Sequence, residues 1–310
     1  MNVRSFRVCL RPLCLALVAL SLATAALPSV AATLDPAVIG KAAGADAKAQ
    51  PDGAIKIGWS RSDVPVTVDG MRLSPAAGLG SWASFTTMGD QAMVMGDTVV
   101  FQDEVDAAMD AAFAHGLSVT GLHNHFFYDQ PKVYFMHLGG EGSPTQLAAG
   151  VRAVWDAIKA VRAAHAQPAD GFGGATPSPG KLSAASIATI IGRPAPVTDG
   201  VAKVTIAREG RMRGHPLGAS MGLTTWAAFS GSDNLASIDG DFIMRADEVR
   251  PVLQALRKAG IHIVALHNHM MGESPNYYFT HFLGKGKAAD LARGFRAALD
   301  AQAANAKQSS

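Results

Sequence analysis

The sequence predicts an α+β fold that occurs twice in one chain, each copy a mostly antiparallel sheet with helices packed on one face. The first observation behind this prediction is an internal repeat: TGLHNHFFYDQPKVYFMHLGGEG at residues 120–142 recurs as VALHNHMMGESPNYYFTHFLGKG at residues 264–286. The second is that strand-like and helix-like periods alternate in the same order within both copies. The third is a hydrophobic content of 48% in 310 residues, which is enough to bury a sizeable core.

The repeat divides the chain into two domains. The match between the two segments extends far upstream without a gap, which places the first copy at residues 33–165 and the second at residues 181–305. Residues 166–180 (AQPADGFGGATPSPG) are rich in Gly, Pro and Ala, as is typical of a linker. The polar residues 306–310 are expected to form a disordered tail.

The elements of the first copy follow in a definite order. Residues 82–87 and 91–101 are rich in aromatic and β-branched residues and are predicted to be strands. Asp103 is expected to cap a helix that runs to His115, and Gly116 to end that helix in the left-handed conformation. The copy is completed by predicted strands at 117–125 and 133–138 and by an amphipathic helix at about 144–164.

The second copy repeats this order. Asp247 and Gly260 take the places of the capping residue and of the terminating glycine. Strands are predicted at 261–269 and 277–283, and the closing helix at about 288–302. Four matched aromatic residues are expected in the core rather than at a binding surface: Trp82, Phe85, Trp226 and Phe229.

The N-terminus is typical of a secretory signal peptide. Three arginines precede an apolar run at residues 13–27, and small residues follow before the expected cleavage near Ala32. The alternative is a membrane anchor, but the run is shorter than the ~20 residues that a spanning helix needs. We therefore expect residues 1–32 to be removed, leaving a periplasmic or secreted protein with no membrane span.

Charge and cysteine content exclude several classes of protein. Lys and Arg number 27 against 25 Asp and Glu, so no basic surface is available for nucleic acid. Cys9 and Cys14 both lie in the expected signal peptide, and neither follows the small residues of a lipoprotein site. Disulfides, zinc fingers, iron–sulfur clusters and cysteine catalysis are thereby excluded from the exported chain. The expected partner is a small molecule or a component of the cell envelope.

Six of the ten histidines occupy matched positions, with the spacing H-x-H-x11-H in both copies. Side chains two residues apart on a strand project from one face, so the first two imidazoles of each set are expected side by side. A hairpin return would bring the third onto the neighbouring strand. This arrangement suits a divalent transition metal, zinc first, with a coordination position left open for water. The predicted metal ligands are His123, His125, His137, His267, His269 and His281.

Other matched polar residues surround these histidines. Asp129 and Glu273 follow the second histidine of each set by four residues. Either is a candidate general base, fourth ligand or residue that orients an imidazole. Two further matched pairs are expected to support the ligands without binding the metal: Asn124 and Asn268, and Tyr134 and Tyr278.

The motif string also resembles a known family. The pattern W-A-A-F…D-E-V…A-G-I…A-L-H-N-H-M…P…Y-F-x-H…G-x-G is similar to that of the LppY/LpqO-like exported proteins, which carry a domain of unknown function. The resemblance covers nearly all of both copies. It implies an exported bacterial protein but supplies no established reaction or catalytic residues. Some mycobacterial members are lipoproteins, whereas this sequence lacks a usable lipobox cysteine.

Three hypotheses about function follow from the histidines. The first is a histidine-rich metal-binding envelope protein that acts as a metal-dependent hydrolase or lyase, with Asp129 or Glu273 as base. The second is a periplasmic module that binds a metal or a ligand without turnover. The third is purely structural, with the imidazoles hydrogen-bonded inside the protein. Whether each copy builds its own site or the two share one cleft is left open by the sequence.

Overall fold

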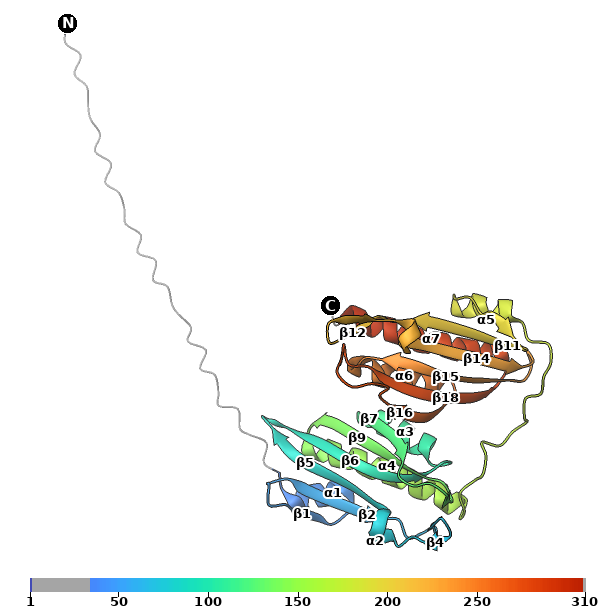
Figure 1. The fold of residues 1–310 in the computed structure, drawn as a ribbon. Helices are drawn as coiled ribbons and strands as arrows, with labels where there is room; N and C mark the ends of the chain where they lie inside the picture. The colour runs from blue at the N-terminus through green and yellow to red at the C-terminus, as the bar shows by residue number, and fades with distance from the viewer. Residues whose placement is uncertain (2–33, 309–310) are drawn as a thin grey trace. The chain divides into compact units, whose positions relative to one another are not determined.

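A single antiparallel sheet of twelve strands runs through both repeats in the computed structural model (Figure 1). Its strand order is β1-β2-β5-β6-β9-β7-β16-β18-β15-β14-β11-β10, so the second half mirrors the first. The halves meet where β7 pairs with β16, through Leu122 opposite Leu266. These two leucines are equivalent positions of the two repeats, and both are buried. The junction is therefore a local two-fold pairing of one strand with its own duplicate.

The structure describes Met1 and residues 34–308. The expected signal peptide, with its cleavage site and both cysteines, lies outside the described residues apart from Met1. Residues 34–308 belong to one unit by their internal contacts. Below, repeat one denotes residues 33–165 and repeat two residues 181–305.

Repeat one contributes six strands and three long or medium helices to this unit. The strands are β1 (Ala47–Ala49), β2 (Ile55–Ser60), β5 (Gly80–Met88), β6 (Gln91–Phe101), β7 (Ser118–Asn124) and β9 (Val133–Gly142). The helices are α1 (Pro36–Ala43), α3 (Val105–Ala114) and α4 (Pro144–Ala164), with a short α2 (Pro75–Gly78). A small separate sheet joins β3 (Thr67–Val68), β4 (Met71–Arg72) and β8 (Asp129–Gln130).

Repeat two reproduces this inventory. Its strands in the large sheet are β10 (Val197–Thr198), β11 (Val201–Ala207), β14 (Thr224–Gly231), β15 (Ala236–Met244), β16 (His262–His267) and β18 (Tyr278–Gly286). Its helices are α5 (Ala184–Ile191), α6 (Ala246–Lys258) and α7 (Ala288–Gln308), with a 3-10 turn η1 (Ala219–Met221). Its small sheet joins β12 (Gly210–Met212), β13 (His215–Leu217) and β17 (Glu273–Ser274). The predicted α+β class and the duplication are confirmed.

The helices of each repeat cover one face of the sheet, and this leaves the other face for the histidines (Figure 1). Strand β9 shows the division by its period of two. Met136 and Leu138 are buried in the main core, which includes the apolar sides of α3 and α4. Val133 and Phe135 point the other way, into a smaller apolar cluster beneath the loops, and His137 shares their face. Strand alternation thus places the histidine opposite the helices.

The predicted helix caps need correction. The N-cap of α3 is Glu104, not Asp103, because Asp103 is held by Arg162 and by the backbone N–H of Ala169. Helix α6 begins earlier than expected, so Asp247 lies in its first turn, where a carboxylate favours the helix dipole. The left-handed glycines were predicted correctly: φ is 79° at Gly116 and 73° at Gly260.

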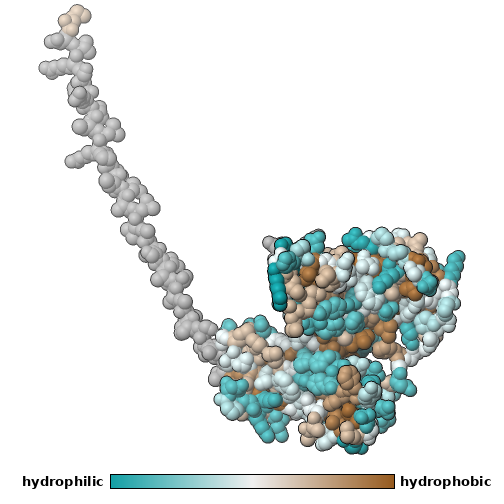
Figure 2. Space-filling model, in the orientation of Figure 1, coloured by the Kyte–Doolittle hydropathy of each residue, from teal (hydrophilic) through white to brown (hydrophobic). Residues whose placement is uncertain are grey.

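The last helix of each repeat begins at the residue that the amphipathic pattern predicts. Helix α4 spans the predicted residues, whereas α7 continues to Gln308, into the expected polar tail. The extension is rich in alanine, the strongest helix former. No helix in the described part of the chain is both long and apolar enough to cross a bilayer. Hydrophobic residues form separate patches among hydrophilic ones on the face shown in Figure 2.

Candidate histidine–aspartate site

In each repeat the structure brings together the three predicted histidines. In repeat one, His123 is the penultimate residue of β7 and His125 lies just beyond the end of that strand. His137 lies on the adjacent strand β9, which pairs with β7 in antiparallel fashion. The rings of His123 and His125 are 5.1 Å apart between centroids, and those of His123 and His137 are 5.0 Å apart. The expected hairpin geometry is therefore present.

The imidazoles of repeat one contact one another. The Nε2 atoms of His123 and His137 lie 2.9 Å apart, so one of them carries the proton that joins them. The ring of His125 stacks on Phe135 at 3.3 Å between centroids. Ligand nitrogens about 2.1 Å from a tetrahedral zinc are roughly 3.4 Å apart, so a small opening of the His123–His137 pair would admit the ion.

The same three positions in repeat two are arranged differently. The rings of His267 and His281 are 4.8 Å apart, and those of His267 and His269 are 5.2 Å apart. Here an aspartate joins the cluster: the Nε2 atom of His269 lies 3.2 Å from Oδ2 of Asp241. The Nδ1 atom of His281 lies 3.9 Å from the other oxygen of Asp241.

The sequence reasoning missed this aspartate. Asp241 on β15 stands directly opposite His281, and its equivalent Asp97 on β6 stands directly opposite His137. Both carboxylates are buried, with 8% of Asp97 and 4% of Asp241 exposed. The available signal was that these are acidic residues at the same repeat offset inside strands, where acidic residues are unfavourable. Each site therefore consists of three imidazoles and one buried carboxylate.

Several buried polar atoms of these sites have no partner among the described residues. They are Oδ1 of Asp97, Oδ1 of Asp241 and Nε2 of His267. A buried polar atom without a hydrogen bond costs about 1–3 kcal/mol. The two aspartate oxygens occupy matched positions of the two repeats.

The protonation of both sites is shifted in a consistent direction. Burial lowers the pKa of His125 and of His269 below the usual range. Burial raises the pKa of Asp241, and the nearby His281 opposes this shift only in part. The lowered pKa of His125 and of His269 favours their neutral form, which is the form that binds metals. A cation placed among these groups would favour the ionised carboxylate.

Asp129 and Glu273 lie elsewhere in the structure. Asp129 is buried in β8 and accepts hydrogen bonds from the backbone N–H of Val133, at 2.7 Å, and from Lys132. Glu273, in β17, accepts from the backbone N–H of Tyr277 at 2.9 Å. Among the described interactions, neither carboxylate contacts a histidine of the site. Both brace the loop between the second and third histidines, next to the cis peptides that precede Pro131 and Pro275.

The four expected supporting residues shape the same loops. The side-chain amides of Asn124 and Asn268 donate to the backbone carbonyls of Phe126 and Met270, at 2.9 and 2.8 Å. Their backbone carbonyls lie 3.3 Å from Nδ1 of His123 and of His267. Tyr134 and Tyr278 are half-buried against the main core, and their hydroxyls have no hydrogen bond to the histidines among the described interactions.

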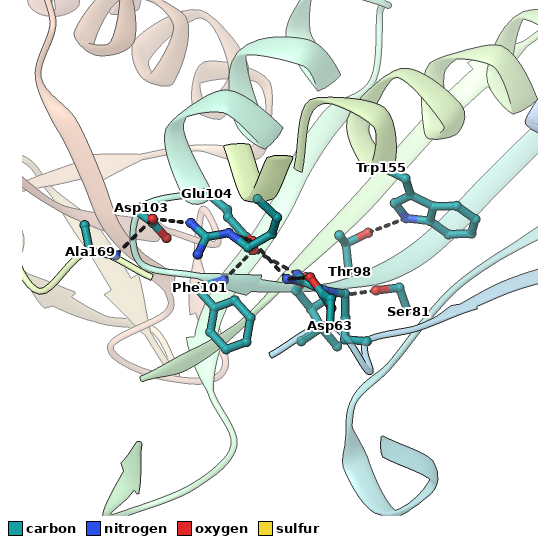
Figure 3. Close-up of polar contacts among 11 residues, drawn as sticks. Asp63, Ser81, Thr98, Phe101, Asp103, Glu104, Trp155 and Ala169 are labelled. Atoms are coloured by element: carbon teal, nitrogen blue, oxygen red, sulfur yellow. Dashed lines mark hydrogen bonds and ion pairs between the residues drawn. The ribbon is translucent and has the colours of Figure 1, made fainter. Parts of the chain in front are cut away.

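A buried ion network fixes the strand end next to Asp97 (Figure 3). The carboxylate of Glu104 accepts hydrogen bonds from both terminal nitrogens of Arg61, at 2.8 and 2.9 Å, and from the N–H of Phe101. Arg61 also donates to the carbonyl of Val99, whose N–H donates to Ser81. The last five residues of β6, beginning with Asp97, are thus held rigidly from both sides. Repeat two keeps the equivalent pair, Arg208 with Glu248.

The matched tryptophans are not core residues, contrary to expectation. Trp82 stands opposite Asp97 on the neighbouring strand, and Trp226 stands opposite Asp241. Both are half-buried on the site face, and a lysine ammonium lies over each ring, Lys56 at 4.7 Å and Lys203 at 4.0 Å. Phe85 and Phe229 are fully buried, as predicted. Each tryptophan therefore flanks a histidine–aspartate cluster.

The described residues contain no ready-made metal cage. Across Met1 and residues 34–308, no group of three or more His, Cys, Asp or Glu side chains already stands in an arrangement that could hold a metal ion. The clusters described above would have to turn their imidazoles about the side-chain bonds to reach one common point. The exposed position of His125 and His269 beyond the strand ends allows that movement.

Comparisons with known proteins place the chain in a family. The family described as "Domain of Unknown Function (DUF1259)" matches residues 37–157 and 185–301. The chain belongs to this family. The two matched regions are consistent with two tandem copies of one domain. No curated protein matches the sequence at a significant level.

Two solved structures show a remote likeness. One is the trimeric bacterial microcompartment shell protein PduB, at 12% identity over 84% of this chain and 92% of that one, with a TM-score of 0.21. The other is EtuB from Clostridium kluyveri, at 11% identity over the same shares, with a TM-score of 0.22. Scores this low do not bear on the architecture or function of this protein.

Proposed function

We propose that this protein binds divalent transition-metal ions, zinc first, at one histidine–aspartate site in each repeat. The observation that carries the proposal is the duplicated cluster of three imidazoles beside a buried aspartate whose Oδ1 accepts no hydrogen bond among the described residues of either repeat. Imidazole and carboxylate are suitable ligands for zinc, copper, iron or nickel. The carboxylate of Asp241, whose ionised form is destabilised by burial, would gain from a bound cation.

Each repeat would hold its own ion. The three imidazoles of a site come from two adjacent strands of the same repeat, and the carboxylate comes from the third. In our proposal the imidazoles are the ligands. The carboxylate next to the metal is that of Asp97 or Asp241. The sequence had suggested Asp129 and Glu273 for this role.

Hydrolysis is the second candidate function, and one observation favours it. An open pocket of about 760 Å³ adjoins the site of repeat one, with Asp97 and His125 in its lining. A metal ion there would be accessible to water and to a small substrate. Zinc lowers the pKa of bound water to about 7, and a neighbouring carboxylate can accept the proton. We also propose that the protein is exported and that it is a relative of the LppY/LpqO-like proteins.

Metal content of the purified protein tests the proposal. Elemental analysis after zinc repletion and desalting should give about two equivalents, as one site per repeat requires. The double variant His123→Ala/His125→Ala should lose one equivalent, and His267→Ala/His269→Ala should lose the other.

The exposed His215 on β13 provides the matched control, because it lies outside both clusters. His215→Ala should keep both equivalents. Folded wild-type protein that retains no zinc, copper, iron or nickel after repletion would refute the proposal. Loss of both equivalents in either double variant would instead indicate one shared site.

A further inference from the structure

The pocket beside the first site has a chemically distinct lining. It is bounded by Gly58 and Ser60 on β2, Pro75 on α2, Trp82 on β5, Asp97 on β6 and Phe135 on β9. Gly58, Trp82, Asp97 and His137 form one row across four adjacent strands. Neighbouring strands are about 4.8 Å apart, so the indole lies within the length of one small molecule from the imidazoles.

The lining has an apolar end and a polar end. Trp82, Pro75 and Phe135 provide apolar surface, whereas Asp97 and His125 are its ionisable residues. No lysine or arginine lines the pocket, and Lys56 contacts Trp82 without being part of that lining. A negatively charged ligand would therefore meet the carboxylate of Asp97 within the lining, whereas the ammonium of Lys56, 4.7 Å from the indole centroid, lies outside it. A neutral ring can stack on the indole while its hydroxyl groups reach Asp97.

Repeat two provides a natural comparison, because it keeps the tryptophan but changes the surroundings. Thr205 stands opposite Trp226 where Gly58 stands opposite Trp82. Asp239 replaces Met95, so the face of repeat two next to its tryptophan is more polar. The pocket near the second site has about 220 Å³ and is lined by its loop, from Asn268 to Tyr278, rather than by Trp226 or Asp241.

We propose that the pocket of repeat one binds a neutral, hydroxylated, ring-shaped small molecule, with Trp82 as the stacking platform and a hydroxyl group directed at Asp97 and His125. The substrate role of this molecule rests on the proposed metal site, whereas its binding needs only the pocket. Repeat two would bind metal in the same way, but Thr205 and Asp239 in place of Gly58 and Met95 would make the surroundings of Trp226 less suitable for this ligand.

Two neutral probes and their charged counterparts test the ligand class. Glucose and phenol are neutral hydroxylated rings, and glucuronate and benzoate carry similar rings with a carboxylate. Binding to the full-length protein is measured by saturation-transfer NMR and calorimetry in the presence of a chelator, so that no bound zinc ion attracts the anionic probes. We expect at least one neutral probe to bind about tenfold more tightly than its anionic counterpart. Binding of glucose alone identifies a carbohydrate ligand, and binding of phenol alone an aromatic one.

Matched variants locate the binding. Trp82→Ala should weaken the bound probe about tenfold, because the stacking surface is lost, while Trp226→Ala should change it less than about twofold. Gly58→Thr copies repeat two and should also weaken binding, which keeps the test valid if Trp82→Ala fails to fold. All three variants should keep the zinc content of the wild type.

The outcomes separate the two proposals. Failure of folded wild-type protein to bind either neutral probe, or equal loss in Trp82→Ala and Trp226→Ala, overturns the pocket assignment even if two equivalents of zinc are present. Tighter binding of the anionic probes overturns the neutral-ligand class. Protein that binds a neutral probe through Trp82 but retains no metal after repletion supports the pocket and overturns the metal site.

Discussion

The two repeats hold the same four side chains in two different arrangements. In repeat one the imidazoles of His123 and His137 contact each other, whereas in repeat two His269 contacts the carboxylate of Asp241. Each arrangement satisfies some polar atoms and leaves a different set without partners. The comparison shows that the same four residue types on the same strands can form either an imidazole–imidazole or an imidazole–carboxylate contact.

One strand position offers a physical cause for this difference. Gly121 stands opposite His137 on the adjacent strand, and a Cβ atom there would lie 3.2 Å from the Cδ2 atom of that imidazole. Repeat two has Ala265 at the equivalent position, opposite His281. The methyl group restricts the imidazole on one side and leaves it nearer to the aspartate. The hydrogen-bonded contact between Nε2 atoms occurs in the repeat that has glycine, although the ring centroids are 5.0 Å apart there and 4.8 Å apart in repeat two.

The buried ion pairs should give the largest difference between the repeats. Glu104 holds two guanidinium groups that are almost fully buried, those of Arg61 and Arg162. Glu248 pairs with arginines that are 20% and 30% exposed. Glu104→Gln should therefore cost about 3–5 kcal/mol of unfolding free energy, and Glu248→Gln about 1–2 kcal/mol, because water can solvate its partners. Urea denaturation measures both, and equal losses would contradict the explanation from burial.

Exchange of the residue opposite the third histidine should have a medium effect. Gly121→Ala is expected to weaken zinc binding in repeat one by about tenfold, because residues that orient ligands contribute about that much. Ala265→Gly should change repeat two in the opposite direction. Competition with a chromophoric chelator measures both affinities. Gly58→Ala, on the same face but two strands further from His137, is the control and should leave zinc affinity unchanged.

Removal of one buried charge should have the smallest effect on stability. Burial raises the pKa of Asp241, so its carboxyl group contributes stability that is fully present below its unfolded pKa and is lost as pH rises through the folded value. In metal-free protein, Asp241→Asn should therefore increase the unfolding free energy by about 1 kcal/mol at pH 8 and by less at pH 4. Thermal unfolding in chelator at both pH values measures the difference.

Bound zinc should reverse the effect of Asp241→Asn on stability. Asp241→Asn should lose the extra stability that the wild type gains from zinc, since binding to the folded state alone stabilises it. The exposed turn residue Asp199 provides a control, because Asp199→Asn removes one charge from the surface of the same repeat. A stability gain that does not depend on pH would show that the charge of Asp241 is not its cause.

The sequence was sufficient to predict the features that depend on short spacings along the chain. Strand alternation and the duplicated spacing correctly placed the first and third histidines of each set on adjacent strands, whereas the strands that were predicted to include His125 and His269 end before these residues. The glycines after α3 and α6 end those helices as predicted. The aspartates were missed because Asp97 and Asp241 reach the histidines through strand pairing between distant segments. No spacing along the chain reveals that β6 lies next to β9.

Other errors have a similar physical origin. Asp129 and Glu273 were selected for their proximity in sequence, but the small sheets that contain β8 and β17 turn their carboxylates toward the backbone of the loop. Asp103 was taken for a helix cap, but a partner 59 residues away, Arg162, holds it instead. Local rules fail at these positions because a tertiary contact competes for the same side chain.

The pairing of Leu122 with Leu266 affects the resistance of this fold to aggregation. An isolated repeat would present the free edge of β7 or of β16, with an unpaired backbone ready to add a strand from another molecule. Two copies in one chain close that edge on themselves, at fixed stoichiometry and independent of protein concentration. The duplication thus acts as an internal safeguard against edge-to-edge aggregation, and neither repeat can be cut away without exposing it.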